Sequence, residues 1–412
     1  MAQLARRLTT SDAVTVGLGA MLGAGVFSAF GPAAEAAGTG LLVGLAIAAG
    51  VAYCNAVASA QLAAVYPVSG GTYVYGRERL GPTWGFLAGW GFVIGKTASC
   101  AAMALTLGAY AVSGHEWVQR LIGVAAVVVL TAANYRGVAK TALLTKVLVA
   151  ATLAVLGLVV VLALTGGMAS STNLEGSWGD PYDVLQAAGL LFFAFAGYAR
   201  IATLGEEVRD PERSIPRAIV VALSIVVAVY LAIGVSVLLA VGADAIAGAP
   251  DPLAIAVDAA GAGWAEPVVR VGAAIASLGA LLVLIAGVGR TSLAMAREGD
   301  LPRVLDAVHP RFRVPHHAEV AVAAVVAVLV LTVDLRGVIG FSSFGVLTYY
   351  AVANASAWTQ PVEQRRWPRA FNVVGLVGCV VLAFTLPVDA VVAGLAMFAI
   401  GLGGRWLLRR TA

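Results

Sequence analysis

The sequence predicts an all-α integral membrane protein with about 12 transmembrane helices. A helix that crosses a bilayer needs ~20 residues. Three observations predict this fold: the composition, the recurrence of long apolar segments and the placement of the basic residues. Of the 412 residues, 60% are apolar and 12% are charged, and the mean hydropathy is +0.91. Soluble chains are about 45–50% apolar and about 25% charged, so this chain has too little polar surface to face water on all sides.

Apolar segments long enough to cross a bilayer recur along the whole chain. The predicted helices lie at about 13–34, 40–65, 84–111, 119–135, 141–165, 184–205, 216–241, 267–296, 318–333, 338–358, 371–386 and 389–408. The first segment follows Arg6 and Arg7, as in a signal peptide, but its length and the many later spans predict a first helix. The loops are too short for a soluble domain, so residues 1–412 are predicted to form one transmembrane domain.

The basic residues predict the orientation of these helices. An even number of helices places both termini on one side of the membrane. Of the 26 basic residues, only Arg120, Arg270 and Arg336 fall in segments on the opposite side. Basic residues accumulate in cytoplasmic loops, so both termini are predicted to be cytoplasmic and the protein to lie in the cell membrane. Topology and contacts with membrane lipid explain the net charge of +4, and no nucleic acid partner is predicted.

Two of the predicted helices contain weak points at similar depth. The first holds Gly17, Gly19, Gly23 and Gly25, and a glycine costs about 1 kcal/mol relative to alanine in a helix interior. The alternative for this helix is close packing through a GxxxG pair. The sixth helix holds Gly197 among aromatic residues. Five helices separate the two points, so their helices run in opposite directions, which is the pattern of an inverted repeat.

We therefore predict inverted repeats at about 12–165 and 183–358, followed by two further helices at about 371–408. In such a fold, two helices broken at the membrane midplane meet. Their free N–H groups attract a carboxylate and their free carbonyls accept hydrogen bonds from an ammonium. A zwitterionic amino acid fits both kinds of group without any charged side chain.

Four motifs carry a resemblance to a known family. They are GAMLGAGVF in the first helix, YPVSGGTYVYGRERLGP at 66–82, FFAFAGYARIATLGEEVRDPERSIPRAI at 192–219 and RTSLAMAREGDLPRVLDAVHPRFRVPHHA at 290–318. Over nearly its whole length the chain resembles the amino acid–polyamine–organocation (APC) superfamily of transporters. The resemblance implies a LeuT-type fold and alternating access, in which helices one, two, six and seven move against helices three, four, eight and nine.

The resemblance also implies a substrate site on the two broken helices. The carboxylate contacts fall on the first helix, whereas an aromatic gate at Phe193 and further amine contacts fall on the sixth. The alternative for Phe193 is a core or lipid-facing aromatic. The implied substrate-binding residues are Ala20, Met21, Gly23, Ala24, Gly25, Phe193, Ala194, Phe195, Ala196 and Gly197.

Lys96 and Thr152 are the predicted coupling or charge sites. Lys96 lies ~13 residues or ~20 Å into the third helix, and a lysine near a helix centre costs about 3 kcal/mol. Three roles are open: a proton carrier, a fixed cation that replaces a sodium ion, or a partner for an anionic substrate. A lysine bonded only to backbone carbonyls is the structural alternative. Thr152 stands where the resemblance places a lysine in some proton-coupled members.

No acidic residue lies near a predicted helix centre, which disfavours a substrate with a second cation, because that charge would be buried without a partner. A neutral amino acid is the favoured substrate, moved with protons, with Na+ or by exchange. The alternative substrates are a cationic amino acid, a polyamine or another amine. A less favoured alternative is that the protein is a receptor or channel.

Glu206, Glu207 and Arg209 are predicted to belong to a cytoplasmic gating loop rather than to a catalytic cluster. The sequence offers no assignable nucleophile–base pair, no phosphate-binding loop and no common metal-ligand spacing. We therefore predict neither an enzyme nor a bound cofactor, and the sequence predicts no oligomeric state.

Overall fold

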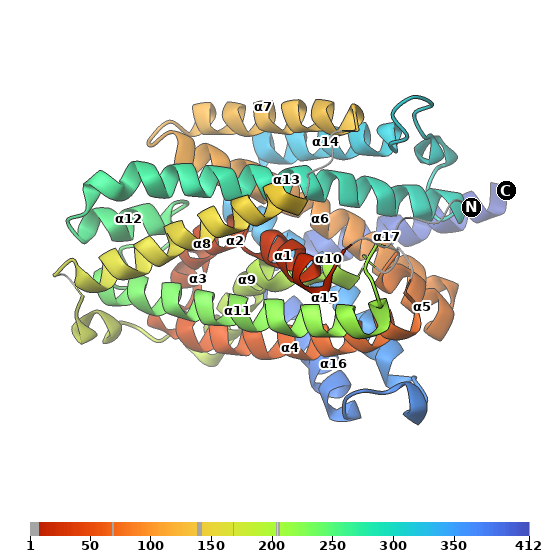
Figure 1. Cartoon of the computed structure of the whole chain (residues 1–412), viewed down its shortest axis with the longest axis horizontal. Coiled ribbons are helices and arrows are strands. Elements are labelled where there is room, and N and C mark those ends of the chain that lie inside the picture. Colours follow the sequence, from red (N-terminus) through yellow and green to blue (C-terminus); the bar gives the residue numbers. More distant parts are fainter. Residues whose placement is uncertain are drawn as a thin grey trace.

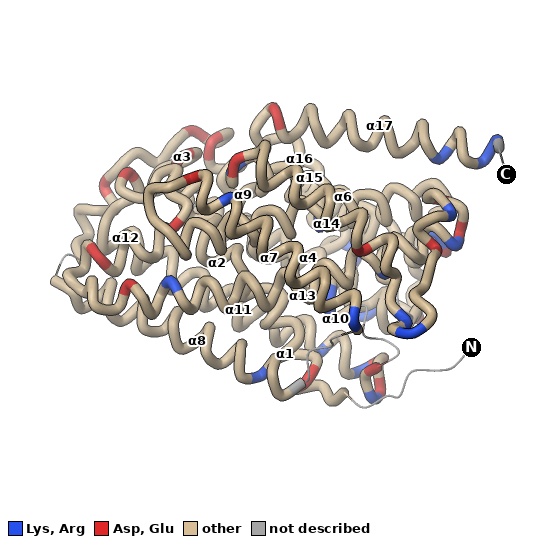
Figure 2. The backbone as a smooth tube through the Cα atoms, turned by 90° about the horizontal axis from the view of Figure 1, so that it is seen from above, with Lys and Arg blue, Asp and Glu red and all other residues tan. Residues whose placement is uncertain are grey.

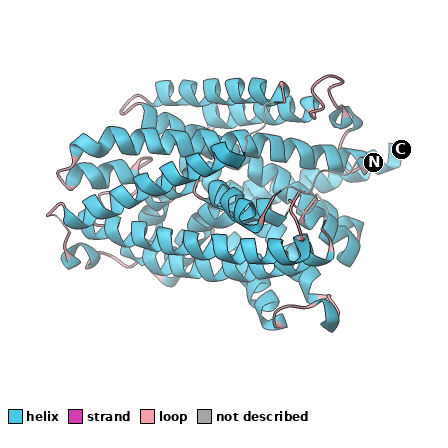
Figure 3. Cartoon of the chain, viewed as in Figure 1, coloured by secondary structure: helices cyan, strands magenta, loops and turns pink. Residues whose placement is uncertain are grey.

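The computed structural model describes residues 8–67, 70–137, 142–167, 169–202, 204 and 207–411. Within these ranges the chain forms a bundle of helices, most of which run along the long axis of the molecule (Figure 1). The loops gather mainly at the two ends of the bundle (Figure 3). Ten helices in this part of the chain are long and apolar enough to span a membrane, and two shorter apolar helices accompany them. The predicted all-helical architecture with many apolar spans is therefore confirmed.

The helices follow the predicted apolar segments closely. The first half comprises α1 (Thr10–Met21), α2 (Ala24–Ser28), α3 (Phe30–Ala37), α4 (Leu41–Val65), α5 (Thr72–Leu80), α6 (Pro82–Ala111), α7 (Glu116–Tyr135) and α8 (Ala142–Thr165). The second half comprises α9 (Pro181–Phe195), α10 (Ala199–Ala202), α11 (Pro211–Val241), α12 (Pro252–Ala259), α13 (Glu266–Arg297), α14 (His316–Thr332), α15 (Leu335–Trp358), α16 (Arg369–Phe384) and α17 (Val388–Thr411).

Two short helices occupy segments that the sequence assigned to loops. α5 lies between Gly71 and Gly81, whose φ angles of 55° and 102° stop the helix at both ends. α12 begins at Pro252, a residue that favours the first turn of a helix. Both helices are too short to span a bilayer, so neither forms one of the long apolar segments on which the prediction was based.

The outer helices expose large apolar side chains. Val129 on α7 is 65% exposed, Leu143 on α8 is 72% exposed, and Val388 on α17 is 69% exposed. Contiguous apolar surface of this kind is rare on soluble monomers, whereas it suits helices that face lipid. Most Lys and Arg segments lie at the end of the bundle where α17 ends (Figure 2). The charge asymmetry along the sequence is therefore also an asymmetry in space.

α6 is buried along almost its whole apolar length and forms the centre of the bundle. Its close neighbour is α15, and glycines bring the two backbones together. A Cβ atom on Gly91 would lie 2.7 Å from the Gly345 carbonyl oxygen, and one on Gly95 would lie 3.0 Å from the Ser342 carbonyl oxygen. Small residues allow such approaches between membrane helices. This packing fixes the position of Lys96, one residue after Gly95.

Candidate functional site

The first membrane span is interrupted between α1 and α2. α1 ends at Met21 and α2 begins at Ala24, so that Leu22 and Gly23 lie outside both helices. A Cβ atom on Gly23 would lie 2.8 Å from the Cβ atom of Ala280 on α13, so the absence of a side chain allows this close contact. The interruption leaves carbonyls in the last turn of α1 and N–H groups in the first turn of α2 available to partners outside their own helices.

The span that begins with α9 is interrupted after Phe195. A 3-10 turn, Ala196–Tyr198, leads from α9 into the short helix α10. Gly197 in this turn lies directly against the first span: a Cβ atom there would be 2.4 Å from the Ala20 carbonyl carbon and oxygen and 2.6 Å from the Met21 nitrogen. The two interruptions are therefore in backbone contact.

A second contact joins the same two segments. A Cβ atom on Gly25 would lie 2.7 Å from the Cα atom of Ala194. The structure thus places all ten predicted substrate-binding residues on two segments that touch each other. Phe193, the predicted aromatic gate, is buried with 7% of its surface exposed, so it does not face lipid.

Tyr230 on α11 joins the two interruptions and was missed in the sequence. Its hydroxyl oxygen lies 2.5 Å from the Met21 carbonyl oxygen and 3.0 Å from the Ala194 carbonyl oxygen. The ring is buried and packs against Phe195 with centroids 5.0 Å apart. The available signal was a lone tyrosine inside the apolar segment VVAVYLAIG, because a buried tyrosine hydroxyl usually finds a hydrogen-bond partner.

Lys96 on α6 also reaches the second interruption. The side chain is buried, and Nζ donates a hydrogen bond to the Ala196 carbonyl oxygen at 3.0 Å. The Tyr350 hydroxyl on α15 donates to the same oxygen at 3.3 Å, and its ring stacks on Tyr198 at 4.9 Å. No ion pair of Lys96 occurs among the residues that the structure describes. Its ammonium is held by a backbone carbonyl rather than by a carboxylate.

Thr152, the other predicted coupling position, makes no side-chain hydrogen bond to either interruption within the described part of the chain. It lies on α8, where its hydroxyl donates to the Leu148 carbonyl one turn earlier at 2.9 Å. Its neighbours Ala151 and Val155 line, together with Thr152, an apolar groove between α8 and α13. Lys96 is thus bonded to the second interruption, whereas the Thr152 hydroxyl is bonded within α8.

The predicted gating loop contacts the segment that precedes α1. The Leu8 N–H donates to the Glu207 carbonyl at 3.0 Å, and the Arg209 N–H donates to the Leu8 carbonyl at 2.9 Å. These bonds form an isolated parallel bridge between Leu8 and Val208. Glu206, the third predicted residue, lies outside the described residues. The bonds that join this loop to Leu8 are therefore made by the backbone.

Two side-chain contacts add to this attachment of α1. Lys146 on α8 forms an ion pair with Asp12 at 2.7 Å, and the Thr10 hydroxyl donates to the Ser214 hydroxyl on α11 at 3.0 Å. The start of the first span is thus tied to two other helices. An opening on this side that moves α1 must break these contacts.

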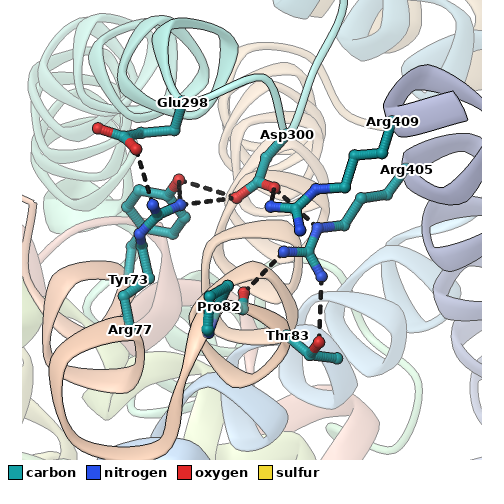
Figure 4. A network of polar contacts seen from close by, with 8 residues as sticks. All are labelled: Tyr73, Arg77, Pro82, Thr83, Glu298, Asp300, Arg405 and Arg409. Carbon is teal, nitrogen blue, oxygen red and sulfur yellow. Dashed lines mark hydrogen bonds and ion pairs between the residues drawn. The ribbon is translucent and has the colours of Figure 1, made fainter. Parts of the chain in front are cut away.

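Asp300, after α13, is the centre of a polar network (Figure 4). Its side chain is fully buried, and it accepts hydrogen bonds from Tyr73 at 2.9 Å, Arg405 at 2.7 Å, Arg409 at 3.1 Å and Arg77 at 3.3 Å. Burial and the neighbouring Asp300 carboxylate raise the pKa of the Tyr73 hydroxyl, so that this group stays protonated and donates. The network joins α5, α13 and α17.

We expect Asp300→Asn to destabilise the protein by about 3–5 kcal/mol, because it leaves the buried Arg405 without its counter-charge. The measurement is the thermal unfolding temperature of the purified protein in detergent. The matched control is Asp306→Asn, which removes an exposed ion pair with Arg297 and should change stability by at most about 1 kcal/mol. Equal unfolding temperatures for the two variants would contradict this role of Asp300.

Comparison with known proteins identifies the family. A family model described as amino acid permease matches residues 8–400. A protein of Mycobacterium tuberculosis named as an uncharacterized transporter is 58% identical, covering 100% of this chain and 93% of the relative. The branched-chain amino acid permease BcaP of Bacillus subtilis is 26% identical, covering 90% of this chain and 84% of the permease. Cationic amino acid transporter 4 of Homo sapiens is 28% identical, covering 86% of this chain and 59% of the transporter. The chain belongs to the amino acid permease family of membrane transporters.

Proposed function

We propose that the protein is a secondary active transporter that carries an amino acid across the cell membrane by alternating access. The observation that carries this proposal is the contact between two interrupted spans, whose carbonyls are bonded by Tyr230 and Lys96 from other helices. Membership of the amino acid permease family supports it. The proposal includes inverted repeats at about 12–165 and 183–358, and cytoplasmic termini on the basic side of the bundle.

The substrate's two charged groups would bind at different parts of these segments. In the proposal, the carboxylate contacts the backbone of Gly23, Ala24 and Gly25, as the family resemblance implies. The ammonium contacts backbone carbonyls at the two interruptions. These carbonyls belong to Ala20, Met21, Phe193, Ala194 and Ala196. These backbone groups recognise only the carboxylate and the ammonium of the substrate. Selectivity for the substrate's side chain would therefore come from the surrounding helices.

A neutral amino acid is the substrate that the site favours. Segments 20–25 and 193–197 contain no acidic residue, and Lys96 adds a positive charge beside the second of them. A dibasic substrate would bury its second cation near this lysine without a counter-charge, which is unfavourable. The name of the Bacillus subtilis permease, for branched-chain amino acids, agrees with this proposal, whereas that of the human relative points to the cationic alternative.

Coupling is proposed to act through Lys96, because its ammonium is bonded to the second interruption and has no carboxylate partner among the described residues. Loss or gain of a proton on Nζ would change the bond to Ala196 and thereby the geometry of the break. The cytoplasmic gate would comprise the loop at Glu207 and Arg209 together with the Leu8 segment that it binds.

Uptake of labelled amino acids into proteoliposomes tests the proposal. We expect saturable uptake of alanine or leucine, stimulated by an inward proton gradient, and little uptake of arginine. Faster uptake of arginine than of either neutral amino acid would replace the neutral substrate with the cationic alternative. Absence of both uptake and exchange for the whole panel would overturn the proposed amino acid substrate.

A further inference from the structure

Carbonyl oxygens at both interruptions are already bonded to side chains of other helices. The Tyr230 hydroxyl lies 2.5 Å from the Met21 oxygen and 3.0 Å from the Ala194 oxygen, and Lys96 Nζ lies 3.0 Å from the Ala196 oxygen. These are three of the five carbonyls that we assign to the substrate's ammonium. Hydroxyl and ammonium donors of the protein therefore stand where a hydroxyl or ammonium donor of a ligand would bind.

We propose that Tyr230 and Lys96 stand in for the substrate's ammonium, so that the carrier can reorient without substrate and performs net transport rather than obligatory exchange. The inference rests on the proposed function and adds the mode of transport to it. It concerns one half of the transport cycle, the return of the carrier after it has released its substrate.

The physical reason is the cost of closing the site over free carbonyls. A backbone carbonyl that is buried away from water needs a hydrogen-bond donor. If only the substrate could supply that donor, a carrier without substrate would close at a penalty, and fast transport would require substrate in both directions. Tyr230 and Lys96 supply donors from α11 and α6, so this penalty is removed for the Met21, Ala194 and Ala196 carbonyls.

The number of donated hydrogens explains how substrate could still bind. A tyrosine hydroxyl carries one hydrogen, so the Met21 and Ala194 oxygens share a single donor. An ammonium carries three hydrogens and can give each of these oxygens a donor of its own. Substrate would thus take over the Met21 and Ala194 carbonyls from Tyr230 and the Ala196 carbonyl from Lys96.

The test compares net uptake with exchange in the same proteoliposomes. Labelled leucine and labelled alanine are the probes, and the liposomes contain either no amino acid or the unlabelled probe. For the unmodified protein we expect net uptake at a rate similar to exchange. For Tyr230→Phe we expect net uptake to fall by about tenfold, as for the loss of a buried hydrogen bond, while exchange continues because the ammonium still satisfies both carbonyls.

Tyr110→Phe is the matched control. Tyr110 is also buried, and its hydroxyl donates to a carbonyl of the first span, that of Phe27, at 2.7 Å. This carbonyl lies beyond the interruption and is not assigned to the substrate. If Tyr110→Phe lowers the stability, net uptake and exchange should fall together. The ratio of these two rates for Tyr110→Phe should therefore equal that of the unmodified protein.

The outcomes separate the inference from the function on which it rests. If the unmodified protein exchanges leucine or alanine but shows no net uptake, transport stands and the inference is wrong. If Tyr230→Phe lowers both rates equally, Tyr230 is a structural residue and the inference is also wrong. If the unmodified protein moves neither probe in either mode, the proposed neutral substrate itself fails. The ratio of net uptake to exchange for the unmodified protein tests the inference even if Tyr230→Phe does not fold.

Discussion

Replacing Lys96 with methionine is expected to abolish the proton-stimulated part of amino acid uptake. Methionine keeps most of the length and packing of the side chain but removes its charge and its donors. Of the described side chains that donate to the Ala196 carbonyl, the Tyr350 hydroxyl at 3.3 Å then remains. A hydrogen bond from a charged group is worth about 1.5–3 kcal/mol, which corresponds to a loss of about ten- to a hundredfold in rate if the bond forms in the limiting step.

The measurement is the initial rate of labelled leucine uptake as a function of external pH, with and without a proton gradient. Thr97→Val is the control at the neighbouring position, because the Thr97 hydroxyl donates within its own helix, to the Val93 carbonyl at 2.7 Å. The control should keep its pH dependence. A Lys96→Met protein with the rate and pH profile of the unmodified protein would show that Lys96 is only a structural donor to a carbonyl.

Gly197→Ala is expected to separate the two interruptions and to reduce transport about five- to 150-fold, because overpacking of about 1–3 kcal/mol is introduced at a backbone contact. The new Cβ atom would lie 2.4 Å from the Ala20 carbonyl and 2.6 Å from the Met21 nitrogen. Neither contact can be relieved by turning a flexible side chain, so one of the two backbone segments must shift.

Uptake and thermal unfolding of the same preparation check this prediction. Gly50→Ala is the control, since a Cβ atom on Gly50 of α4 meets no atom within 4 Å. That variant should be unchanged or slightly more stable, because alanine favours a helix over glycine. Normal uptake by Gly197→Ala would mean that the contact between the interruptions is not needed for transport.

The apolar spans could be predicted from the sequence because each is a local property of about 20 consecutive residues. The glycines of the first span also marked the segment in which the structure interrupts it, since Gly23 lies between α1 and α2. Composition was therefore sufficient for the helices and for the weak points of two of them. It was insufficient for α5 and α12, which are short and end at glycine or begin at proline.

The polar contacts at the site could not be predicted, because they join residues that are far apart in the chain. Lys96 and Ala196 are 100 positions apart, and Tyr230 and Met21 are 209 positions apart. No helical periodicity records which carbonyl a buried donor reaches. The depth of Lys96 in its helix predicted a functional or bonded lysine, but only the packing of α6 against α15 gives it Ala196 as a partner.

Thr152 shows the opposite limit. Alignment with a family motif placed it at a coupling position, but its hydroxyl bonds within α8, and its neighbours line a groove toward α13. A role for Thr152 in coupling therefore stays a prediction without a contact to support it. Alignment with a family identifies an equivalent position in a helix. The contacts at that position depend on the side chain that this chain has there.

Counterflow is the measurement that tests the proposed carrier most directly. Proteoliposomes loaded with unlabelled leucine or alanine are diluted into a trace of the same labelled amino acid. An alternating-access carrier is expected to accumulate the label transiently above its external concentration, and the effect should saturate as the external concentration rises. A label that only equilibrates, without transient accumulation, would indicate a channel. A label that binds but does not enter would indicate a receptor, and either result would contradict the proposed transport.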